Sequence, residues 1–493
     1  MRYYQLGCWL LLLSCCLVGC YKEEVVFEAI PDDKLELPLI LALDDQLCFF
    51  DAASNSLRYP IENDSIVDFR PHVRFQNYAQ LALDNKTLEN NTINSFGTVR
   101  IGETYRIIVT IQGVSKTLYL SFTTLPMMRV VTPNAIVNEP KCLARLTINY
   151  TDQNKPVQTS FIGIEVRGNI SQSNPKKSYS FTFLNSLNTR DKAARGVFDW
   201  EEKEAWILDA AYSDRSRLRN RLSFALWKDM NPTQHAYIRG NYVELYLNNT
   251  CLGLYSLNEQ LNSEHLSLTH PEAVLYKAKE WGGATSFNYL SGTPPSRSFW
   301  EGWEQKHPDP SAYIYWQPLY DLRYWAIRST NDDFIRKAAD EVDLPTLMDY
   351  YIFIHLIGAS DNYGKNLYWM QKSANDPFVL IPWDMDNSWG NGGLSTSYLP
   401  TGNSIYNRLL VLNPDNFRGR LKARWQVLRT TLASANAIDV RLQQAFQALS
   451  RTTVLPIENS IWGQNLDWAN EEVYMKSWMQ YRLVFLDDHF NNL

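Results

Sequence analysis

Histidine and cysteine are scarce in this sequence of 493 residues, which holds seven of each. Three cysteines, Cys48, Cys142 and Cys251, lie beyond the first 20 residues and are widely separated. This spacing excludes a disulfide framework and the usual zinc or iron–sulfur sites, and buried thiols are the expected state, although one bridge among the three stays open. The histidines yield neither a Ser-His-Asp order nor a metal cluster. Basic residues are not in excess either: a formal net charge of −6 argues against a general nucleic-acid binder.

The apolar run from Leu10 to Val18 is too short for a transmembrane helix, which needs about 20 apolar residues. With Arg2 before it, the run has the length of a signal-peptide core. It closes with Leu17-Val18-Gly19-Cys20, which resembles a lipobox, where cleavage precedes a cysteine that receives diacylglycerol. We therefore predict a signal peptide over 1–19, a lipid on Cys20, a tether over 20–34, and a place in the cell envelope, at the outer membrane or cell surface. An ordinary secretory signal is the alternative.

The fold class is predicted to be α+β, with a β-sandwich-like domain over 35–125 at its start. Strand signals are clearest near the end of that range. Tyr105 to Ile111 is rich in β-branched residues, Gln112-Gly113 offers a turn, and Thr117 to Thr124 alternates apolar and polar residues. Such a module serves either as a spacer above the membrane or as a ligand-binding domain.

A second domain is expected over 130–485, with mixed strand and helix signals. The segment from Pro126 to Pro140 is either a linker or the first strand of this unit. Further on, the pattern predicts strands at Ile162 to Val166 and Tyr179 to Phe183, a helix from Asp214 to Met230, a hairpin around Asn248-Asn249, a long insertion over 282–315, and helices between Phe417 and Leu449.

The chemically informative stretch runs from Asp343 to Gly390. Asp343 is a natural N-cap, and the helix that follows should end near Gly358. A polar loop over 360–366 comes next, then a hairpin formed by Leu367 to Met370 and Phe378 to Ile381. Since the two ends of a hairpin lie close together, the residue after its second strand returns to the start of its first.

This order is expected to gather Asp361, Asn366 and Asp384 in a small volume, with Asp386 as a further candidate. Carboxylate and amide oxygens repel one another there unless a cation joins them, and they suit Mg²⁺ or Mn²⁺ with phosphate. Protein kinases present the same parts in the same order: a catalytic loop with Asp-x4-Asn, a hairpin, and a metal-binding Asp. In that interpretation Asp361 acts on the accepting hydroxyl. A set of capping and turn-forming side chains is the alternative.

Six motifs in the same order resemble the spore-coat-protein-H (CotH) kinase family, over roughly residues 130 to 480. They are Arg167-Gly168-Asn169 with Asn174-Pro175-Lys176-Lys177-Ser178-Tyr179, Trp206-Ile207-Leu208 with Tyr212-Ser213-Asp214 and Leu218-Arg219-Asn220, Tyr242 to Asn248 with Gly253-Leu254-Tyr255 and Glu259-Gln260, Trp303-Glu304-Gln305-Lys306, Asp361-Asn362-Tyr363 with Lys365-Asn366, and Pro382-Trp383-Asp384.

The resemblance implies an atypical, two-lobed protein-kinase-like domain that transfers phosphate from ATP. Lys177 or its neighbour Lys176 would contact the nucleotide phosphates, and Arg167 would bind phosphate or anchor an internal carboxylate. Glu259 is the candidate partner of the phosphate lysine, because the helix that follows Asp214 holds no Glu. A Gly-x-Gly-x-x-Gly loop is absent from the sequence, as it is from the family.

Two other functions compete with phosphotransfer to a protein, whose identity the sequence does not give. The anchor, the β module and 16 Trp residues also fit a non-catalytic surface module that binds glycan or an envelope protein. A glycosidase using Asp384 and Asp386 ranks below both, because these residues are two apart and no separate general acid is identifiable.

Overall fold

The computed structural model describes residues 40–168 and 170–493. The predicted signal segment, Cys20 and the motif residue Asn169 lie outside this part of the chain. Within it, none of the helices combines the length and apolar character needed to cross a membrane. Cys48, Cys142 and Cys251 are buried free thiols, as predicted.

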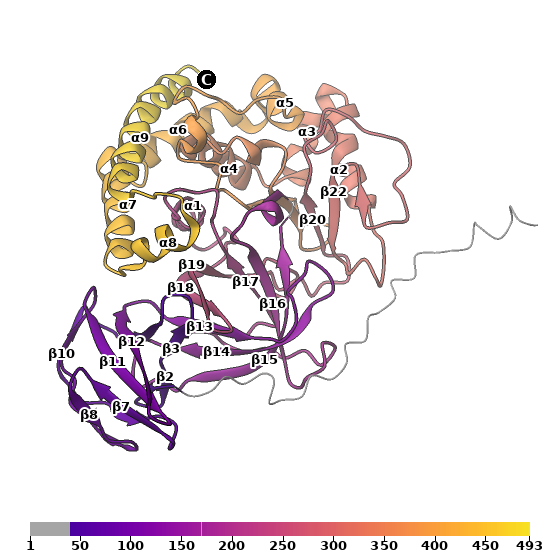
Figure 1. Cartoon of the computed structure of the whole chain (residues 1–493). Coiled ribbons are helices and arrows are strands. Elements are labelled where there is room, and N and C mark those ends of the chain that lie inside the picture. The colour runs from indigo at the N-terminus through magenta and orange to yellow at the C-terminus, as the bar shows by residue number, and fades with distance from the viewer. Residues whose placement is uncertain (1–39, 169) are drawn as a thin grey trace, which may run out of the picture.

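The segment from residue 40 to 123 contains strands and no helix among its described residues (Figure 1). Apolar side chains from its sheets share one core around Tyr59, Phe69 and Phe122. The sheets have the strand orders β2-β1-β6-β9, β10-β5 and β3-β4-β12-β11-β7-β8. The strands are β1 Ala42–Leu43, β2 Gln46–Leu47, β3 Phe49–Asp51, β4 Ser56–Pro60, β5 Ser65–Phe69, β6 His72–Arg74, β7 Ala79–Leu83, β8 Lys86–Leu88, β9 Thr92–Ile93, β10 Gly97–Arg100, β11 Thr104–Ile111 and β12 Val114–Thr123.

A closed barrel follows, in the order β13-β14-β15-β16-β17-β19-β18. Its first strand occupies the segment for which the sequence left a linker or a strand open. The β18–β19 hairpin turns at Asn248-Asn249, as predicted. The barrel strands are β13 Met127–Val131, β14 Cys142–Asn149, β15 Gln158–Arg167, β16 Ser178–Leu184, β17 Ala205–Asp209, β18 Gly240–Leu247 and β19 Thr250–Glu259.

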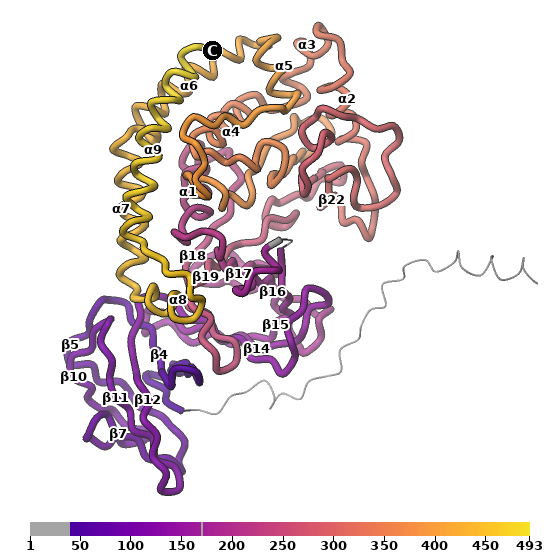
Figure 2. The backbone as a smooth tube through the Cα atoms, turned by 45° about the horizontal axis from the view of Figure 1, so that its top comes forward, coloured from indigo at the N-terminus to yellow at the C-terminus, as the bar shows by residue number. Residues whose placement is uncertain are grey.

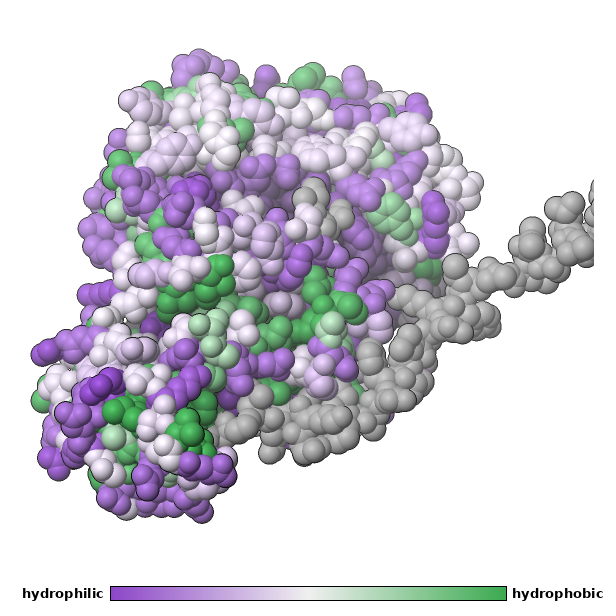
Figure 3. All heavy atoms as spheres, viewed as in Figure 1, coloured by the Kyte–Doolittle hydropathy of each residue, from purple (hydrophilic) through white to green (hydrophobic). Residues whose placement is uncertain are grey.

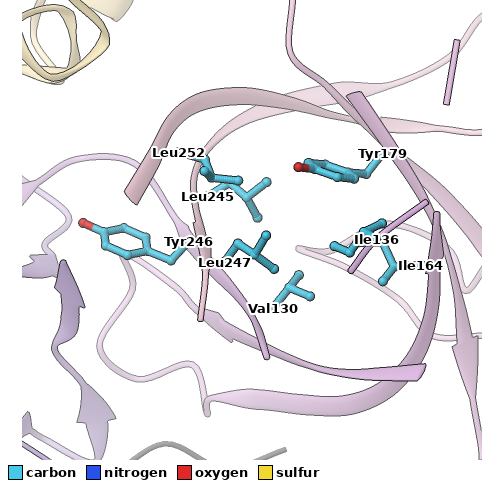
Figure 4. A pocket seen from close by; sticks show the side chains of 8 residues that line it. All are labelled: Val130, Ile136, Ile164, Tyr179, Leu245, Tyr246, Leu247 and Leu252. Atoms are coloured by element: carbon cyan, nitrogen blue, oxygen red, sulfur yellow. The ribbon is translucent and has the colours of Figure 1, made fainter. Parts of the chain in front are cut away.

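Apolar side chains fill the barrel, among them Val130, Ile164 and Leu245. A small apolar hollow beside them leaves no room for a water molecule (Figure 4). The barrel is therefore a packed core rather than a ligand pocket.

The helix predicted over Asp214 to Met230 begins only at Arg219 and forms α1, Arg219–Met230. The Asp214 carboxylate accepts hydrogen bonds from the backbone N–H groups of Ser216 and Arg219, at 2.9 and 2.8 Å. Arg217 also has a left-handed φ of 62°. Asp214 thus organises the turn before the helix, so the prediction was wrong by about one turn and a half.

A five-stranded sheet and a group of helices complete the chain (Figures 1 and 2). The predicted insertion over 282–315 is not a plain loop, because two of its strands extend this sheet, in the order β21-β22-β20-β23-β24. The strands are β20 Val274–Ala278, β21 Phe299–Trp300, β22 Trp303–His307, β23 Leu367–Gln371 and β24 Val379–Pro382. The helices are α2 Gln317–Arg328, α3 Asn331–Glu341, α4 Leu344–Ile357, α5 Ser404–Leu412, α6 Phe417–Thr430, α7 Ala435–Ser450, α8 Val454–Trp462 and α9 Trp468–Asn491.

Helix α4 lies at the centre of this part and is buried on all sides. A helix that is apolar all round belongs in a core, and its residues join the largest apolar cluster of the protein. The active-site candidates follow directly from its C-terminal end.

The N-terminal sheets pack against the barrel rather than hanging from a linker. Arg58 on β4 forms a buried ion pair with Glu244 on β18, at 2.7 Å, and also donates to the backbone oxygen of Thr452 at 3.3 Å. The rings of Phe49 and Tyr246 meet edge to face at 5.5 Å. Figure 2 shows α8 beside both the barrel and the N-terminal strands. The N-terminal module is thus part of one packed body.

Candidate active site

The loop that carries Asp361 is fixed by the end of helix α4. The Asp343 side chain caps the start of that helix by accepting from Thr346 N, at 2.7 Å. Gly358 ends it with a left-handed φ of 65°, and a Cβ there would lie 2.8 Å from the Trp478 ring. Only glycine fits this position without strain, so the chain turns here into the short helical turn η3, Asp361–Tyr363.

The β23–β24 hairpin brings Asp384 back beside Asn366, as its predicted geometry requires. Leu367 pairs with Pro382 at the open end. Trp383 N donates to Asn366 O at 3.0 Å, and Asn366 Nδ2 lies 3.5 Å from Asp384 O. Asn366 and Asp384 both have a left-handed φ of 56°. Such conformations cost free energy and gather at functional sites.

Asn362 fastens the loop to the hairpin. Its side-chain nitrogen donates to the backbone oxygens of Asn366 and Trp383, at 2.7 and 2.8 Å, and it is fully buried. The Tyr350 hydroxyl on α4 donates to Asn362 O at 2.7 Å. One amide therefore sets the position of the Asp361 loop relative to the Asp384 strand.

Asp361 faces two side chains that the sequence analysis did not assign. Its Oδ2 lies 3.8 Å from Lys365 Nζ, and its Oδ1 accepts from the Trp281 indole N–H at 3.3 Å. The carboxylate stays 30% exposed. It is therefore oriented by its neighbours and still open to an incoming hydroxyl.

Asp384 is reached by solvent although protein surrounds it. Its side chain is exposed to solvent, yet the surrounding protein raises the pKa of the carboxyl by desolvation, and Asp209 raises it further. Solvent exposure and a raised pKa are compatible here, because water reaches the carboxyl group from one side while protein surrounds its other sides. Figure 3 shows hydrophilic side chains along the hollowed band between the barrel and the helices. Lys277, Arg167 and Lys365 act in the opposite direction on the Asp384 pKa.

Asp386 stands close enough to Asp384 for the two charges to oppose each other. Burial, followed by the Asp384 charge, raises the pKa of Asp386 to about 8, although its Oδ2 accepts from Ser213 Oγ at 2.8 Å. Each of these two carboxyl groups therefore lies where its ionised form is disfavoured.

Carboxylate and amide oxygens of this kind are preferred ligands of Mg²⁺. Within residues 40–168 and 170–493, His, Cys, Asp and Glu side chains form no group of three or more that would hold a metal by themselves. Mg²⁺ does not require such a cage, because it is usually bound by one or two carboxylates with phosphate and water. Asp384, Asp386 and the Asn366 amide offer that smaller set.

The amine of Lys176 is paired inside the protein. Its Nζ forms an ion pair with Glu458 at 2.8 Å and donates to Leu254 O at 2.5 Å, and both charged side chains are fully buried. Arg217 pairs with the other oxygen of Glu458 at 3.1 Å. The prediction that Lys176 contacts nucleotide phosphate is therefore not supported, since its charge is used inside the protein.

Lys177, Glu259 and Arg167 have different surroundings. Lys177 Nζ donates to Gln172 O at 2.5 Å, in the loop between β15 and β16. Glu259 is buried and pairs with Arg239 at 2.6 Å, so its predicted pairing with a phosphate lysine is wrong. The Arg167 guanidinium lies over the Trp383 ring, 5.6 Å from its centroid. Of the predicted nucleotide-binding residues, Arg167 lies nearest the metal-ligand candidates.

Sequence reasoning missed three residues of the site, Asp209, Lys277 and Trp281. Asp209 ends β17, directly after the motif Trp206-Ile207-Leu208, and its Oδ2 accepts from Asn220 at 3.2 Å. A charged residue where an apolar strand ends was the available signal. For Lys277 and Trp281 no local signal exists, because the pairing of β20 with β23 creates their position.

The profile of the CotH kinase protein family matches residues 164–486. The chain belongs to the CotH kinase protein family. The match begins within β15, so β13 and β14 of the CotH barrel precede it in the chain. A search of curated proteins finds no match. Family membership makes this a kinase-like protein of mixed α and β structure, with the loop, hairpin and metal-ligand candidates inside the matched region.

Proposed function

We propose that this CotH-family protein transfers a phosphate from ATP to a hydroxyl group of a protein, while anchored to a membrane through a lipid on Cys20. The proposal is supported mainly by the way in which Asn362 joins the Asp361 loop to the β23–β24 hairpin. The loop and the hairpin bring Asp361, Asn366 and Asp384 to one cleft from positions up to 23 residues apart in the chain. This is the order of parts that phosphoryl transfer uses in kinases.

Asp361 is the proposed catalytic base. Its carboxylate orients the accepting hydroxyl and takes its proton as the oxygen attacks the γ-phosphorus. The new O–P bond forms as the bond from that phosphorus to the bridging β,γ-oxygen breaks, and ADP leaves. Lys365 and the Trp281 N–H hold the carboxylate in place from its two sides.

Asn366, Asp384 and Asp386 are the proposed ligands of Mg²⁺ or Mn²⁺. When bound, the cation would neutralise charge on the β- and γ-phosphates. The raised pKa values of Asp384 and Asp386 support this assignment, because a dication would stabilise the ionised carboxylates that the protein alone disfavours.

Transfer of labelled phosphate from ATP to casein and to the protein itself tests the proposal. We expect labelling by the wild type with Mg²⁺ or Mn²⁺, a fall of about 100-fold or more for Asp361→Ala, and loss for Asp384→Ala. Asp376→Ala is the matched control, because this exposed Asp lies at the far turn of the same hairpin. Equal labelling by wild type and Asp384→Ala would refute the proposal.

Anchoring is tested separately. The wild type should incorporate a labelled fatty acid and partition into detergent, and Cys20→Ser should do neither. Labelling that survives in Cys20→Ser would show that the anchor is absent or lies elsewhere, without bearing on phosphotransfer.

A non-catalytic glycan-binding module is the second candidate. It is favoured by the exposed aromatic side chain of Trp281, which is 49% exposed and donates to Asp361. Binding to a glycan array that survives Asp361→Ala and is lost in Trp281→Ala, in a protein that does not bind nucleotide, would favour this function.

A further inference from the structure

Lys277 and Arg167 share one aromatic platform. The Lys277 amine lies 5.5 Å from the centroid of the Trp383 ring, and the Arg167 guanidinium lies 5.6 Å from it. Lys277 also lies 5.6 Å from the Tyr368 ring, which is the cross-strand neighbour of Lys277 on β23. Two cations from different parts of the fold, the barrel strand β15 and the sheet strand β20, therefore meet at one indole.

The platform is held rigidly. Trp383 is buried, and its backbone N–H and C=O are bonded to Asn366 O and to the Asn362 side chain. The rings of Phe224 and Tyr368 meet its indole edge to face, at 6.2 and 5.8 Å. Because Trp383 directly precedes Asp384, the two cations are placed beside the metal-ligand candidates.

Neither cation has an anionic partner within the described part of the chain. The side chains of Arg167 and Lys277 make ring contacts there and no ion pair or hydrogen bond. Asp384 influences Lys277 through space but forms an ion pair with neither cation. The Lys277 pKa is lowered to about 8, first by burial and then by the Arg167 and Lys306 charges, while Asp384 and Glu304 act in the opposite direction. Two like charges that are partly removed from water repel each other, and an anion between them would relieve that repulsion.

We propose that Lys277 and Arg167 form an anion clamp at Trp383 that binds a phosphate group of the nucleotide. The source of the phosphate rests on the proposed function; the clamp itself rests on the two unpaired cations. Arg supplies a planar fork and Lys a compact charge, and together they suit an oxygen-rich anion of more than one charge. In this cleft the clamp takes the role that the sequence had suggested for Lys176 or Lys177.

Titration calorimetry of the full-length protein with inorganic tripolyphosphate, without metal or nucleoside, tests the clamp directly. We expect the wild type to bind, and Lys277→Met and Arg167→Met each to weaken binding about tenfold or more. Lys277→Arg should retain most of the affinity. Lys337→Met is the matched control, since it removes an equal charge from the exposed face of α3.

The outcomes separate the two proposals. Tripolyphosphate binding that is unchanged in Lys277→Met and Arg167→Met, or absent from the wild type, would overturn the clamp. Binding that depends on Lys277 in a protein that transfers no label would overturn phosphotransfer and leave the clamp standing. Thermal melting of each variant shows whether it is folded, and Lys277→Arg keeps the test decisive if Lys277→Met does not fold.

Discussion

Two charged clusters in this molecule differ in how completely their charges are paired. Around Glu458, both carboxylate oxygens are occupied by Lys176, Arg217 and the backbone N–H of Leu254, and the three charged side chains are fully buried. Around Asp384, carboxylates face one another, and of the three nearby cations Lys365 pairs with Asp361 while Arg167 and Lys277 form no ion pair within the described residues.

The paired charges around Glu458 stabilise the fold, whereas the charges around Asp384 are arranged as in a ligand-binding site. A buried charge is tolerated when each of its atoms has a partner, and its removal leaves the partners stranded. A cleft with uncompensated charges and left-handed backbone at Asn366 and Asp384 costs stability, which is characteristic of functional sites. The variants below test this distinction, from the largest expected effect to the smallest.

Glu458→Ala should have the largest effect on stability. It strands Lys176 and Arg217 inside the protein, so we expect the free energy of unfolding to fall by about 3–5 kcal/mol in urea denaturation. Glu472→Ala, which breaks a surface pair with Lys476, should cost under about 1 kcal/mol. Similar losses in the two variants would contradict the structural role of the Glu458 cluster.

Gly253→Ala should damage the same cluster from the other side. A Cβ at Gly253 would lie 2.2 Å from the Glu458 carboxylate, at a φ of +79°. Gly113 has a φ of +80° with open space around it, so Gly113→Ala isolates the backbone strain of about 1 kcal/mol. We expect Gly253→Ala to lose about 1–2 kcal/mol more than this control in urea denaturation, because the carboxylate must move. If the free energy of unfolding fell equally in Gly253→Ala and Gly113→Ala, the Glu458 carboxylate would be able to move away from the new Cβ without loss of stability.

Asp384→Asn should leave stability nearly unchanged while it abolishes transfer. It removes one of the opposed negative charges and keeps the shape of the side chain, so the free energy of unfolding should stay within about 1 kcal/mol of the wild type or rise. Melting and labelling of the same sample check both effects. Strong destabilisation of Asp384→Asn would show that Asp384, like Glu458, stabilises the fold.

Local signals along the chain predicted much of the catalytic region. Asp343 and Gly358 mark the bounds of α4, and the turn at residues 374–377 marks the hairpin. Because both patterns are local, the meeting of Asn366 and Asp384 could be deduced from chain order. The strands at β11, β12, β15 and β16 followed from alternation in the same way, with bounds within a few residues.

Partners from distant segments could not be predicted. The partner of Lys176 is Glu458, 282 residues away on α8, and no motif links them. Lys277 sits in an unremarkable strand and gains its role only from pairing with Tyr368. The predicted start of α1 was wrong for a related reason. The Asp214 carboxylate accepts hydrogen bonds from the backbone N–H and from the guanidinium of Arg219, so Asp214 lies before the helix instead of beginning it. Barrel closure from β13 to β18 likewise depends on contacts that the sequence does not mark.

His355 offers a third kind of buried group, one that is kept neutral. It lies inside α4, where its Nδ1 is 2.7 Å from Tyr351 O, and it is fully buried. Burial lowers its pKa well below the usual 6.5, and the neighbouring His489 and Arg482 lower it further. Unlike Lys176, this group avoids the cost of an unpaired charge by not carrying one.

The neutral His355 therefore predicts a dependence of stability on acid pH. As pH falls below 6.5, the unfolded chain binds a proton at residue 355 that the folded chain does not, so the free energy of unfolding should decrease by up to about 1.4 kcal/mol per pH unit. His355→Gln should reduce this slope in urea denaturation between pH 6.5 and 5, whatever its effect on stability at pH 7. The exposed His270 is the control, and His270→Gln should leave the slope unchanged. A slope as steep in His355→Gln as in the wild type would show that other groups set the acid sensitivity.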